Sequence, residues 1–238
     1  MRTALITGGS RGIGAAMVRA FCQAGYRVAF LYRSSREAAL ALQAACGAAA
    51  ILCDVRDSEQ VSAACAEALR ELTHIDVLIN NAGIAQQKLL TDLTDEDWRA
   101  MLDTHLSGAF YVTRAVLPGM ISRKSGRIIN IGSIWGQVGA SCEAHYSAAK
   151  AGLIGLTKAL AKEVGPSGIT VNCVCPGVID TDMLSGFTRD DLAALCQDTP
   201  MGRLGTPEDV ARCALWLARE DADFITGQIV GVGGGFGE

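Results

Sequence analysis

The feature that most constrains the fold of this chain is an alternation of short β-rich runs with longer segments of helical period. Each β-rich run has the length of one strand: Thr3–Thr7, Arg27–Tyr32, Ala49–Cys53, Asp76–Asn80, Arg127–Ile131, Thr170–Val174 and Gln228–Val232. Segments of helical period separate most of these runs, namely Ile13–Ala24, Glu37–Cys46, Glu59–Leu72, Glu96–Ile121 and Ala148–Val164. Such an alternation indicates right-handed βαβ units, and it predicts an α/β fold with a parallel sheet.

The composition supports one α/β domain. The 238 residues contain no Pro/Ser-rich linker, low-complexity run or internal repeat, so we expect residues 1–238 to form a single domain. Half of the residues are apolar and 5% are aromatic, which is typical of helices packed closely on a buried parallel sheet. After the sixth β-rich run, residues 176–205 are rich in turn formers and predict only a short helix near Asp190–Gln197. Long insertions are often lids, so we expect a substrate lid at about 176–205.

Charge, cysteine usage and hydropathy argue against several classes of function. Lys plus Arg number 21 against 25 Asp plus Glu, so the chain lacks the positive field that dominates nonspecific binding to nucleic acid. The nine Cys form no CxxC pair and the His residues show no metal-like spacing, so we expect reduced thiols and no metal. Met1 runs directly into the first β-rich run, and no apolar run approaches the length of about 18 residues that spans a bilayer. We therefore expect a cytoplasmic protein with neither nucleic-acid nor membrane partners.

A glycine-rich segment lies between the first β-rich run and the first helical segment. Residues Thr7–Gly14 read Thr-Gly-Gly-Ser-Arg-Gly-Ile-Gly. Glycines let the backbone turn tightly and approach a pyrophosphate, while a helix start offers free N–H groups and the positive end of its dipole. The positions of Gly8, Gly12 and Gly14 depart from the GxGxxG spacing. The segment indicates a dinucleotide site, with an ordinary glycine-rich turn as the alternative.

The end of the second β-rich run bears on the choice of cofactor. Dinucleotide folds that use NAD place an acid there to bind the ribose 2′-hydroxyl, whereas this chain has Tyr32 followed by Arg33, Ser34 and Ser35. Arg11 lies in the glycine-rich segment, so two guanidinium groups and nearby hydroxyls are available to surround a 2′-phosphate. The pattern predicts NADPH; the alternative is that both arginines are solvated surface charges.

Three residues form a candidate catalytic set. Tyr146 and Lys150 are four residues apart at the start of a helical segment, which places the phenol and the ammonium on one helix face. A cation held nearby favours phenolate and lowers the pKa of the tyrosine towards the working pH of a proton donor. Ser133 follows the fifth β-rich run, where its hydroxyl can hydrogen-bond a carbonyl oxygen. Taken singly, these residues are explained as a half-buried helix residue, a solvated lysine and a turn cap; their joint occurrence with the glycine-rich segment favours carbonyl chemistry.

These motifs, in this order, resemble the short-chain dehydrogenase/reductase family and, within it, the 3-oxoacyl-[acyl-carrier-protein] reductases. The resemblance covers essentially the whole chain, and the further matching motifs are Asp54-Val55, Asn80-Asn-Ala-Gly83, Pro176-Gly177 with Thr181, and Ile225-Thr-Gly-Gln228. It implies a single-domain Rossmann fold with a doubly wound, seven-stranded parallel sheet and helices on both faces. It also implies a homotetramer.

The resemblance further implies roles for individual residues. Tyr146 is expected to be the acid, Ser133 to orient the carbonyl, and Lys150 to lower the pKa of Tyr146 and hold the ribose of the cofactor. The implied cofactor-binding residues are Gly8, Ser10, Arg11, Gly12, Ile13, Gly14, Arg33, Ser34, Asp54, Val55, Asn81, Ala82, Gly83, Tyr146, Lys150, Pro176, Gly177, Ile179 and Thr181.

The implied reaction is the NADPH-dependent reduction of a 3-oxoacyl thioester of acyl carrier protein or coenzyme A, as in fatty acid biosynthesis. One alternative is a dehydrogenase or reductase of free small alcohols, diketones or sugars, which would share every catalytic residue. A more distant alternative is a nucleotide-binding regulatory protein without turnover.

The chain departs from the family pattern at two places. His105 occupies the position of an Asn that commonly completes a proton relay through water to the lysine, so His105 is expected either to serve that relay or to be a structural helix residue. The tail Val230–Glu238 lacks the usual Asp before Gly-Gly, which bears on the contact between subunits. Arg123, Lys124 and Arg127 suggest a docking surface that steers an acidic acyl carrier protein towards the cleft; the alternative is a solvated basic turn.

Overall fold

The sheet of the computed structural model, which describes residues 1–237, has its strands in the order β3-β2-β1-β4-β5-β6-β7, all parallel. The strands are β1 (Thr3–Thr7), β2 (Arg27–Tyr32), β3 (Ala49–Leu52), β4 (Val77–Asn80), β5 (Gly126–Ile131), β6 (Ile169–Pro176) and β7 (Ile229–Val232). The α-helices are α1 (Gly12–Gln23), α2 (Arg36–Cys46), α3 (Ser58–Leu72), α4 (Asp95–Leu102), α5 (Gly108–Arg123), α6 (Trp135–Val138), α7 (Ala144–Val164), α8 (Arg189–Gln197) and α9 (Pro207–Leu217). The predicted doubly wound, seven-stranded parallel sheet is confirmed.

The observed elements differ from the predicted ones mainly at their ends. β6 extends two residues beyond its expected carboxyl end, and all of its residues are buried. α7 begins at Ala144 rather than Ala148, so Tyr146 lies in its first turn. α9 was not among the predicted segments. It begins with a capping box, in which Thr206 Oγ1 accepts from Asp209 N and the Asp209 carboxylate accepts from Thr206 N.

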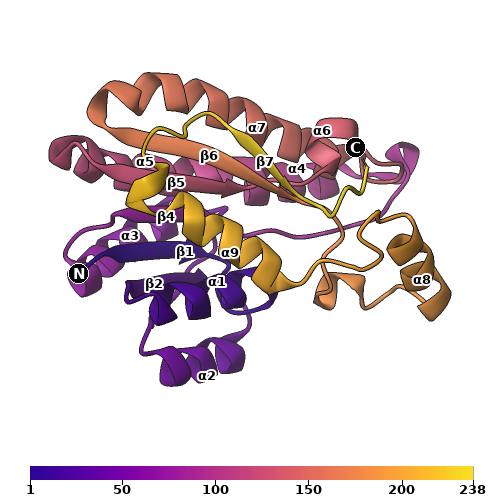
Figure 1. Cartoon of the computed structure of the whole chain (residues 1–238), viewed down its shortest axis with the longest axis horizontal. Helices are drawn as coiled ribbons and strands as arrows, with labels where there is room; N and C mark the ends of the chain where they lie inside the picture. The colour runs from indigo at the N-terminus through magenta and orange to yellow at the C-terminus, as the bar shows by residue number, and fades with distance from the viewer. Residues whose placement is uncertain (238) are drawn as a thin grey trace.

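The helices cover both faces of the sheet, and each face has its own apolar cluster. Residues of α1, α2 and α9 pack with Ile6 and Phe30 on one face, while residues of α3, α5 and α7 pack with Leu5 and Leu31 on the other. Neighbouring strand residues therefore point to opposite faces. Figure 1 shows α9 lying beside α1, although the two helices come from opposite ends of the chain. None of the helices described in residues 1–237 has both the length and the apolar character needed to span a bilayer.

The strand order reverses between β1 and β4, and this reversal fixes where a ligand site can lie. The chain first builds the sheet from β1 outwards to β3, and then returns to place β4 on the other side of β1. Connections that leave to opposite sides open a crevice beyond the carboxyl ends of the two central strands. The glycine-rich segment follows β1 and Asn81 follows β4, so both lie at this edge.

The prediction of one continuous helical segment over Glu96–Ile121 is wrong in one detail. A π-helical turn at Asp103–Ser107 lies between α4 and α5, with His105 at its centre. Within it, Thr104 Oγ1 bonds back to Ala100 O at 2.7 Å. Such turns occur frequently at functional sites. The apolar periodicity of the sequence does not reveal this one, because α4 and α5 continue the same helical path on either side.

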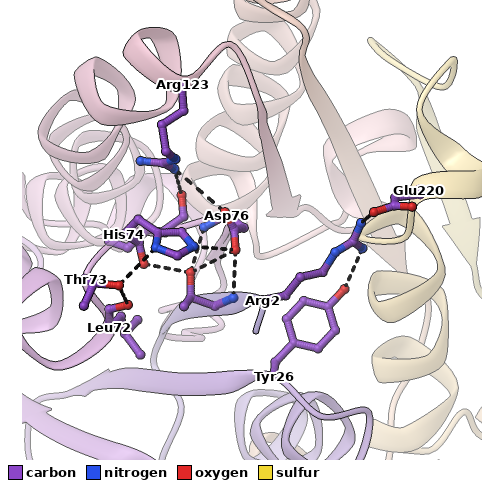
Figure 2. A network of polar contacts seen from close by, with 10 residues as sticks. Arg2, Tyr26, Leu72, Thr73, His74, Asp76, Arg123 and Glu220 are labelled. Carbon is purple, nitrogen blue, oxygen red and sulfur yellow. Dashed lines mark hydrogen bonds and ion pairs between the residues drawn. The ribbon is translucent and has the colours of Figure 1, made fainter.

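A polar network closes the opposite, amino-terminal edge of the sheet. The Asp76 carboxylate, just before β4, accepts hydrogen bonds from Thr3 N at 2.9 Å and Thr3 Oγ1 at 3.2 Å, and lies 3.2 Å from His74 Nε2. The Arg123 guanidinium, at the end of α5, is 4.0 Å from the same carboxylate and donates to Ile75 O at 2.6 Å. Figure 2 shows His74 and Arg123 converging on Asp76. The network joins the starts of β1 and β4 to the end of α5.

Asp76→Ala is expected to destabilise the fold, because it removes the acceptor of the N–H of Thr3, a residue that is 1% exposed. Removing one partner of a buried hydrogen bond costs about 1–3 kcal/mol. Urea denaturation measures the loss, and Asp76→Asn, which keeps an acceptor oxygen, should lose less. Asp223 is an exposed carboxylate, and Asp223→Ala should stay within about 0.5 kcal/mol of the parent. Equal losses in the two alanine variants would contradict this account.

Candidate active site and cofactor site

The segment from β1 into α1 is too tight for side chains at Gly8, Gly9 and Gly14. A Cβ on Gly8, whose φ is +66°, would lie 2.7 Å from Ala82 Cα, and a Cβ on Gly14 would lie 2.1 Å from Gly8 O. Gly12, with a φ of +50°, begins α1 in a conformation that favours glycine. The first N–H groups of α1 have no partner within the helix and form its anion-binding end. The turn therefore has the form of a phosphate cradle.

The carboxyl end of β4 is hydrogen-bonded to this glycine turn. Thr7 Oγ1 accepts from Asn81 N and Ala82 N, each at 2.9 Å. Asn81 Nδ2 donates to Thr7 O at 3.0 Å and to Gly8 O at 3.1 Å. A Cβ on Gly83 would lie 2.5 Å from His105 Cε1, so this short segment contacts the glycine turn and His105 together. The sequence analysis assigned residues 81–83 to the cofactor site but missed Thr7, whose hydroxyl joins the two strand ends.

Two exposed arginines lie beyond the carboxyl ends of β1 and β2. The Arg11 side chain is 60% exposed and pairs with Asp182 at 3.8 Å. Arg33 is exposed, and no carboxylate in residues 1–237 forms an ion pair with it. Next to these arginines in the sequence, Ser10 is half-buried and Ser34 is exposed. Both guanidinium groups are therefore accessible to an anion at this edge.

Asp54 and Val55 follow β3 at the same edge. The Asp54 carboxylate pairs with Arg56 at 2.6 Å, and this contact holds the pKa of Asp54 below its usual value. Arg33 lowers it further. Val55 is buried, and a Cβ on Gly108 would lie 2.9 Å from Val55 Cγ2, so the π-helical turn and α5 begin in close contact with this segment.

The segment that leaves β6 runs back over the glycine turn. A Cβ on Gly12 would lie 3.5 Å from Thr181 Cγ2, and Arg11 pairs with the next residue, Asp182. Ile179 is buried and forms a parallel bridge with Gly205. Pro176, Gly177, Ile179 and Thr181 thus connect β6 to the cradle. Figure 1 shows α8, further along this segment, outside the layers of the sheet.

Ser133, Tyr146 and Lys150 come together at the carboxyl edge of β5. Ser133 lies two residues beyond β5, and its Oγ accepts from Trp135 N at 3.2 Å. Lys150 is 4% exposed, and its Nζ donates to O of Ile131, the last residue of β5, at 2.7 Å. The same Nζ lies 5.5 Å from the centroid of the Tyr146 ring. The first two turns of α7 therefore bring a phenol and an ammonium to the strand end that precedes Ser133.

Burial controls the protonation of the phenol and the ammonium. It raises the pKa of Tyr146 to about 12 and lowers the pKa of Lys150 to about 8. The Ser133 hydroxyl lowers the pKa of Tyr146 and Glu143 raises it, each by less than burial does. Burial is the largest of these effects, so the pKa of Tyr146 is raised rather than lowered as expected, and the phenol is protonated at neutral pH. Glu143 was not among the expected site residues, although its place three residues before Tyr146 is visible in the sequence.

His105 lies against Tyr146, and the two rings meet edge to face with centroids 5.2 Å apart. His105 Nε2 contacts the backbone of Ile84, 3.1 Å from N and 2.8 Å from O. Its Nδ1 is buried, and no atom of residues 1–237 hydrogen-bonds it. Burial holds the pKa of His105 well below its usual value, so the ring is neutral.

A cavity of about 10 Å³ separates His105 from Lys150. This volume is close to that of one water molecule. Its lining includes Asn80, Thr7 and Thr104. Within the described chain, Asn80 Oδ1 lacks a hydrogen-bond partner, as does His105 Nδ1. The cavity is therefore polar, and unsatisfied groups line it from two elements.

The basic residues expected near the cleft lie at the opposite edge of the sheet. Arg123, Lys124 and Arg127 flank the amino end of β5, whereas Ser133 follows its carboxyl end. Arg127 and Ser133 are six positions apart in sequence, which extended chain spans over about 20 Å. Arg123 is also engaged in the network of Figure 2. Within one chain the cluster therefore does not face the cleft, and the docking of an acidic carrier on it stays a prediction.

The residues at the carboxyl edge fit a dinucleotide cofactor. The Cβ positions of Gly8 and Gly14 are blocked by Ala82 and by the backbone of the turn itself, as expected for the tight, closely packed βα turn of a dinucleotide site. The start of α1 supplies unpaired N–H groups, and Arg11 and Arg33 supply positive charge beside it. Ser133, Tyr146 and Lys150 lie further along the same edge, where the reacting end of such a cofactor would meet a carbonyl.

Comparison with known proteins assigns the chain to a family. The family model described as enoyl-(acyl carrier protein) reductase matches residues 8–237. The chain is 45% identical to an acetoacetyl-CoA reductase of Shinella zoogloeoides, over 98% of each chain. It is 41% identical to the 3-oxoacyl-[acyl-carrier-protein] reductase FabG of Chlamydia muridarum and 39% identical to that of Escherichia coli strain K12, with 98% of this chain and 96% of each relative covered. The chain therefore belongs to the short-chain dehydrogenase/reductase family, whose members are oxidoreductases that use a nicotinamide cofactor.

Proposed function

We propose that this protein uses NADPH to reduce the ketone of a 3-oxoacyl thioester to the 3-hydroxyacyl form. The observation that carries the proposal is the set formed by the buried Ser133 and Lys150 and the half-buried Tyr146, at the edge of the sheet that also bears the phosphate cradle. The names of the relatives support the substrate class, since they are acetoacetyl-CoA and 3-oxoacyl-[acyl-carrier-protein] reductases.

Ser133 and Tyr146 act on the carbonyl oxygen in this proposal. When bound, the nicotinamide cofactor supplies the hydride for the carbonyl carbon. Ser133 Oγ accepts from Trp135 N, which leaves its own hydrogen free to donate to the carbonyl oxygen. Tyr146 is protonated at neutral pH because burial raises its pKa, and it gives that oxygen a proton. Both groups stabilise the negative charge that develops on the oxygen in the transition state.

Lys150 is assigned to hold the ribose hydroxyls of the cofactor and to return a proton to Tyr146. Its Nζ donates one hydrogen bond to Ile131 O, and the ammonium has two further N–H donors. With a pKa of about 8, the lysine gains and loses protons near neutral pH. A water in the neighbouring cavity would hydrogen-bond Lys150, His105 Nδ1 and Asn80 Oδ1. His105 is thus assigned to the proton path, with a structural helix residue as the alternative.

The preference for NADPH over NADH rests on Arg11 and Arg33. Both guanidinium groups are exposed at the edge where the 2′-phosphate would lie; Arg11 pairs with Asp182 at 3.8 Å, and within residues 1–237 no carboxylate pairs with Arg33. The other residues assigned to the cofactor are Gly8, Ser10, Gly12, Ile13, Gly14, Ser34, Asp54, Val55, Asn81, Ala82, Gly83, Pro176, Gly177, Ile179 and Thr181.

The proposal treats residues 1–238 as one catalytic domain with a substrate lid at about 176–205. This segment carries the short helix at Asp182–Leu184 and α8, and its side chains Met183 and Met201 are apolar and exposed, as contacts for an acyl chain would be. A homotetramer is also proposed. Phe110 and Ile121 on α5 are large exposed apolar side chains that contact between subunits would bury.

A turnover panel tests the function. Purified protein receives NADPH or NADH with acetoacetyl-CoA, an acetoacetyl thioester of acyl carrier protein, a free diketone, a sugar or crotonyl-CoA, and cofactor oxidation is followed by absorbance. The highest kcat/KM is expected for an acetoacetyl thioester with NADPH. Faster turnover of the diketone or sugar would favour the small-carbonyl reductase, and faster turnover of crotonyl-CoA would favour an enoyl reductase. No turnover would favour the nucleotide-binding regulatory protein.

Tyr146→Phe is expected to lower kcat for the best substrate of the panel at least about 100-fold, because it removes the general acid. NADPH affinity, measured by the change in cofactor fluorescence, should stay within a few-fold of the parent, since the ring is kept. Near-normal turnover of the Phe variant would remove Tyr146 from the proposed mechanism.

Arg33→Ala is expected to weaken NADPH selectively. Truncating one partner of a hydrogen bond to a charged group costs about 1.5–3 kcal/mol, so KM for NADPH should rise about tenfold or more while KM for NADH changes little. Arg19→Ala, at an exposed position of α1 away from the glycine turn, is the matched control. Equal losses with both cofactors would show that Arg33 does not bind the 2′-phosphate.

His105→Leu is expected to lower kcat about tenfold or more, because leucine leaves the cavity water without the partner at Nδ1. His105→Asn, which restores a polar group, should retain substantial activity. Cofactor affinity and the thermal midpoint of both variants separate a lost proton path from a disturbed helix. A Leu variant with the kcat of the parent would mean that the side chain has no part in proton transfer.

A further inference from the structure

Three ionisable side chains share one face of the start of α7. Glu143 is the residue before the helix, Tyr146 follows three residues later, and Lys150 follows four residues after that. Residues spaced by three and four lie on the same side of a helix. The phenol therefore has an ammonium on one side and a carboxyl group on the other. The proposed mechanism uses the ammonium and leaves the carboxyl group without a role.

The position of Glu143 is fixed by the loop that follows β4. Gln87 Nε2 donates to Glu143 Oε1 at 3.3 Å, and Lys88 N donates to Cys142 O at 2.7 Å. On the helix side, Ser147 N donates to Glu143 O at 2.8 Å. The side chain is half-buried. The carboxyl group is therefore held at the start of α7 rather than extended into solvent.

The same loop is anchored on α4 and on the residue before the phenol. Gln86 Nε2 donates to Asp97 Oδ1 at 2.7 Å, so Gln86 Oε1 is the acceptor for His145 Nε2 at 3.0 Å. This assigns the Nε2–H tautomer to His145, which is fully buried, and burial lowers its pKa. Lys88 Nζ pairs with Asp97 Oδ2 at 2.7 Å. The cation of the loop is thus committed to Asp97 and does not neutralise Glu143.

The titratable groups around the phenol come from four places in the chain. Glu143 lies just before α7, Lys150 on α7, the neutral His105 on the π-helical turn and Cys175 on β6. The negative charge of Glu143 raises the pKa of Tyr146, and half-burial raises the pKa of Glu143 itself. A second negative charge brought next to Tyr146 would therefore be repelled by the Glu143 carboxylate. Lys88, the cation of the loop after β4, does not screen this carboxylate because it is paired with Asp97.

We propose that Glu143 is a specificity-determining residue that selects neutral 3-oxoacyl esters and thioesters over 3-oxo acids with a free carboxylate. The inference rests on the proposed function. In a 3-oxo acid the carboxylate is two carbons from the reacting ketone, so binding places it within a few ångströms of Tyr146, where the Glu143 carboxylate repels it. In a thioester the same carbon is neutral. The enzyme would thus reduce activated acyl groups and spare the corresponding free acids.

A second consequence follows for pH dependence. Reduction needs the protonated phenol, so kcat/KM for a neutral substrate falls as the pH rises through the pKa of Tyr146. The carboxylate of Glu143 raises that pKa, and its removal should move the alkaline limb to lower pH. The measurement is kcat/KM for a neutral substrate as a function of pH, with the alkaline limb of Glu143→Gln expected at lower pH than that of the parent.

The test compares ethyl acetoacetate with acetoacetate, a neutral ester and an anion that share the reacting ketone. In Glu143→Gln, which keeps a group able to bond Gln87, the ratio of kcat/KM for acetoacetate to that for the ester should rise about three- to tenfold. Glu163→Gln removes one charge from the exposed far end of the same helix, 20 residues or about 30 Å away, and should leave the ratio unchanged. Glu143→Asp keeps the charge and should keep the discrimination.

The outcomes separate this inference from the function on which it rests. If the parent reduces neither substrate nor acetoacetyl-CoA, the proposed function fails. If the parent reduces the ester and Glu143→Gln keeps the parent's ratio and alkaline limb, the inference alone is overturned. NADPH affinity by fluorescence and the thermal midpoint report whether each variant is folded. Should Glu143→Gln fail to fold, loss of discrimination in Glu143→Asp, whose charge is retained, would equally overturn it.

Discussion

The site depends on one close approach, that of the end of β4 to the glycine turn after β1. Thr7 Oγ1 accepts two backbone N–H groups from β4's continuation, and the Asn81 amide bonds back to the turn. These contacts need the missing side chain of Gly8, whose Cβ would meet Ala82 at 2.7 Å. Because the strand order reverses between β1 and β4, this contact also sets the crevice in which phosphate cradle and reactive side chains share one edge.

Desolvation decides which groups at this edge carry charge. It keeps Tyr146 protonated, brings Lys150 to a pKa of about 8 and makes His105 neutral. Each of these states suits a group that passes a proton towards a ketone rather than one that holds a permanent charge. Glu143 is half-buried, and burial raises the pKa of its carboxyl group as well.

The sequence predicted the strands well because each is a short apolar run bounded by turn formers, and it identified Tyr146 and Lys150 because helical spacing brings them together in any helix. Features that depend on residues distant in sequence could not be predicted from the sequence in the same way. The π-helical turn around His105 does not alter the apolar period, and the phenol's pKa depends on burial by residues distant in sequence. The basic cluster at Arg127 is close to Ser133 along the chain, yet a strand runs between them and carries them to opposite edges.

The two edges of the sheet differ in how well their polar groups are paired, and the difference has a physical consequence. At the amino edge the Asp76 carboxylate is bonded from several sides. Buried side-chain atoms without partners in residues 1–237 belong to Asn80, His105 and His145 at the functional edge, with Arg127 Nε as the exception at the other. Unpaired buried groups cost stability, so they persist where a ligand, a water or a transferred proton completes them. Asn80 and His105, which carry two of these unpaired atoms, line one cavity beside Lys150. The loss of stability caused by these atoms is therefore located where the proposed proton transfer would take place.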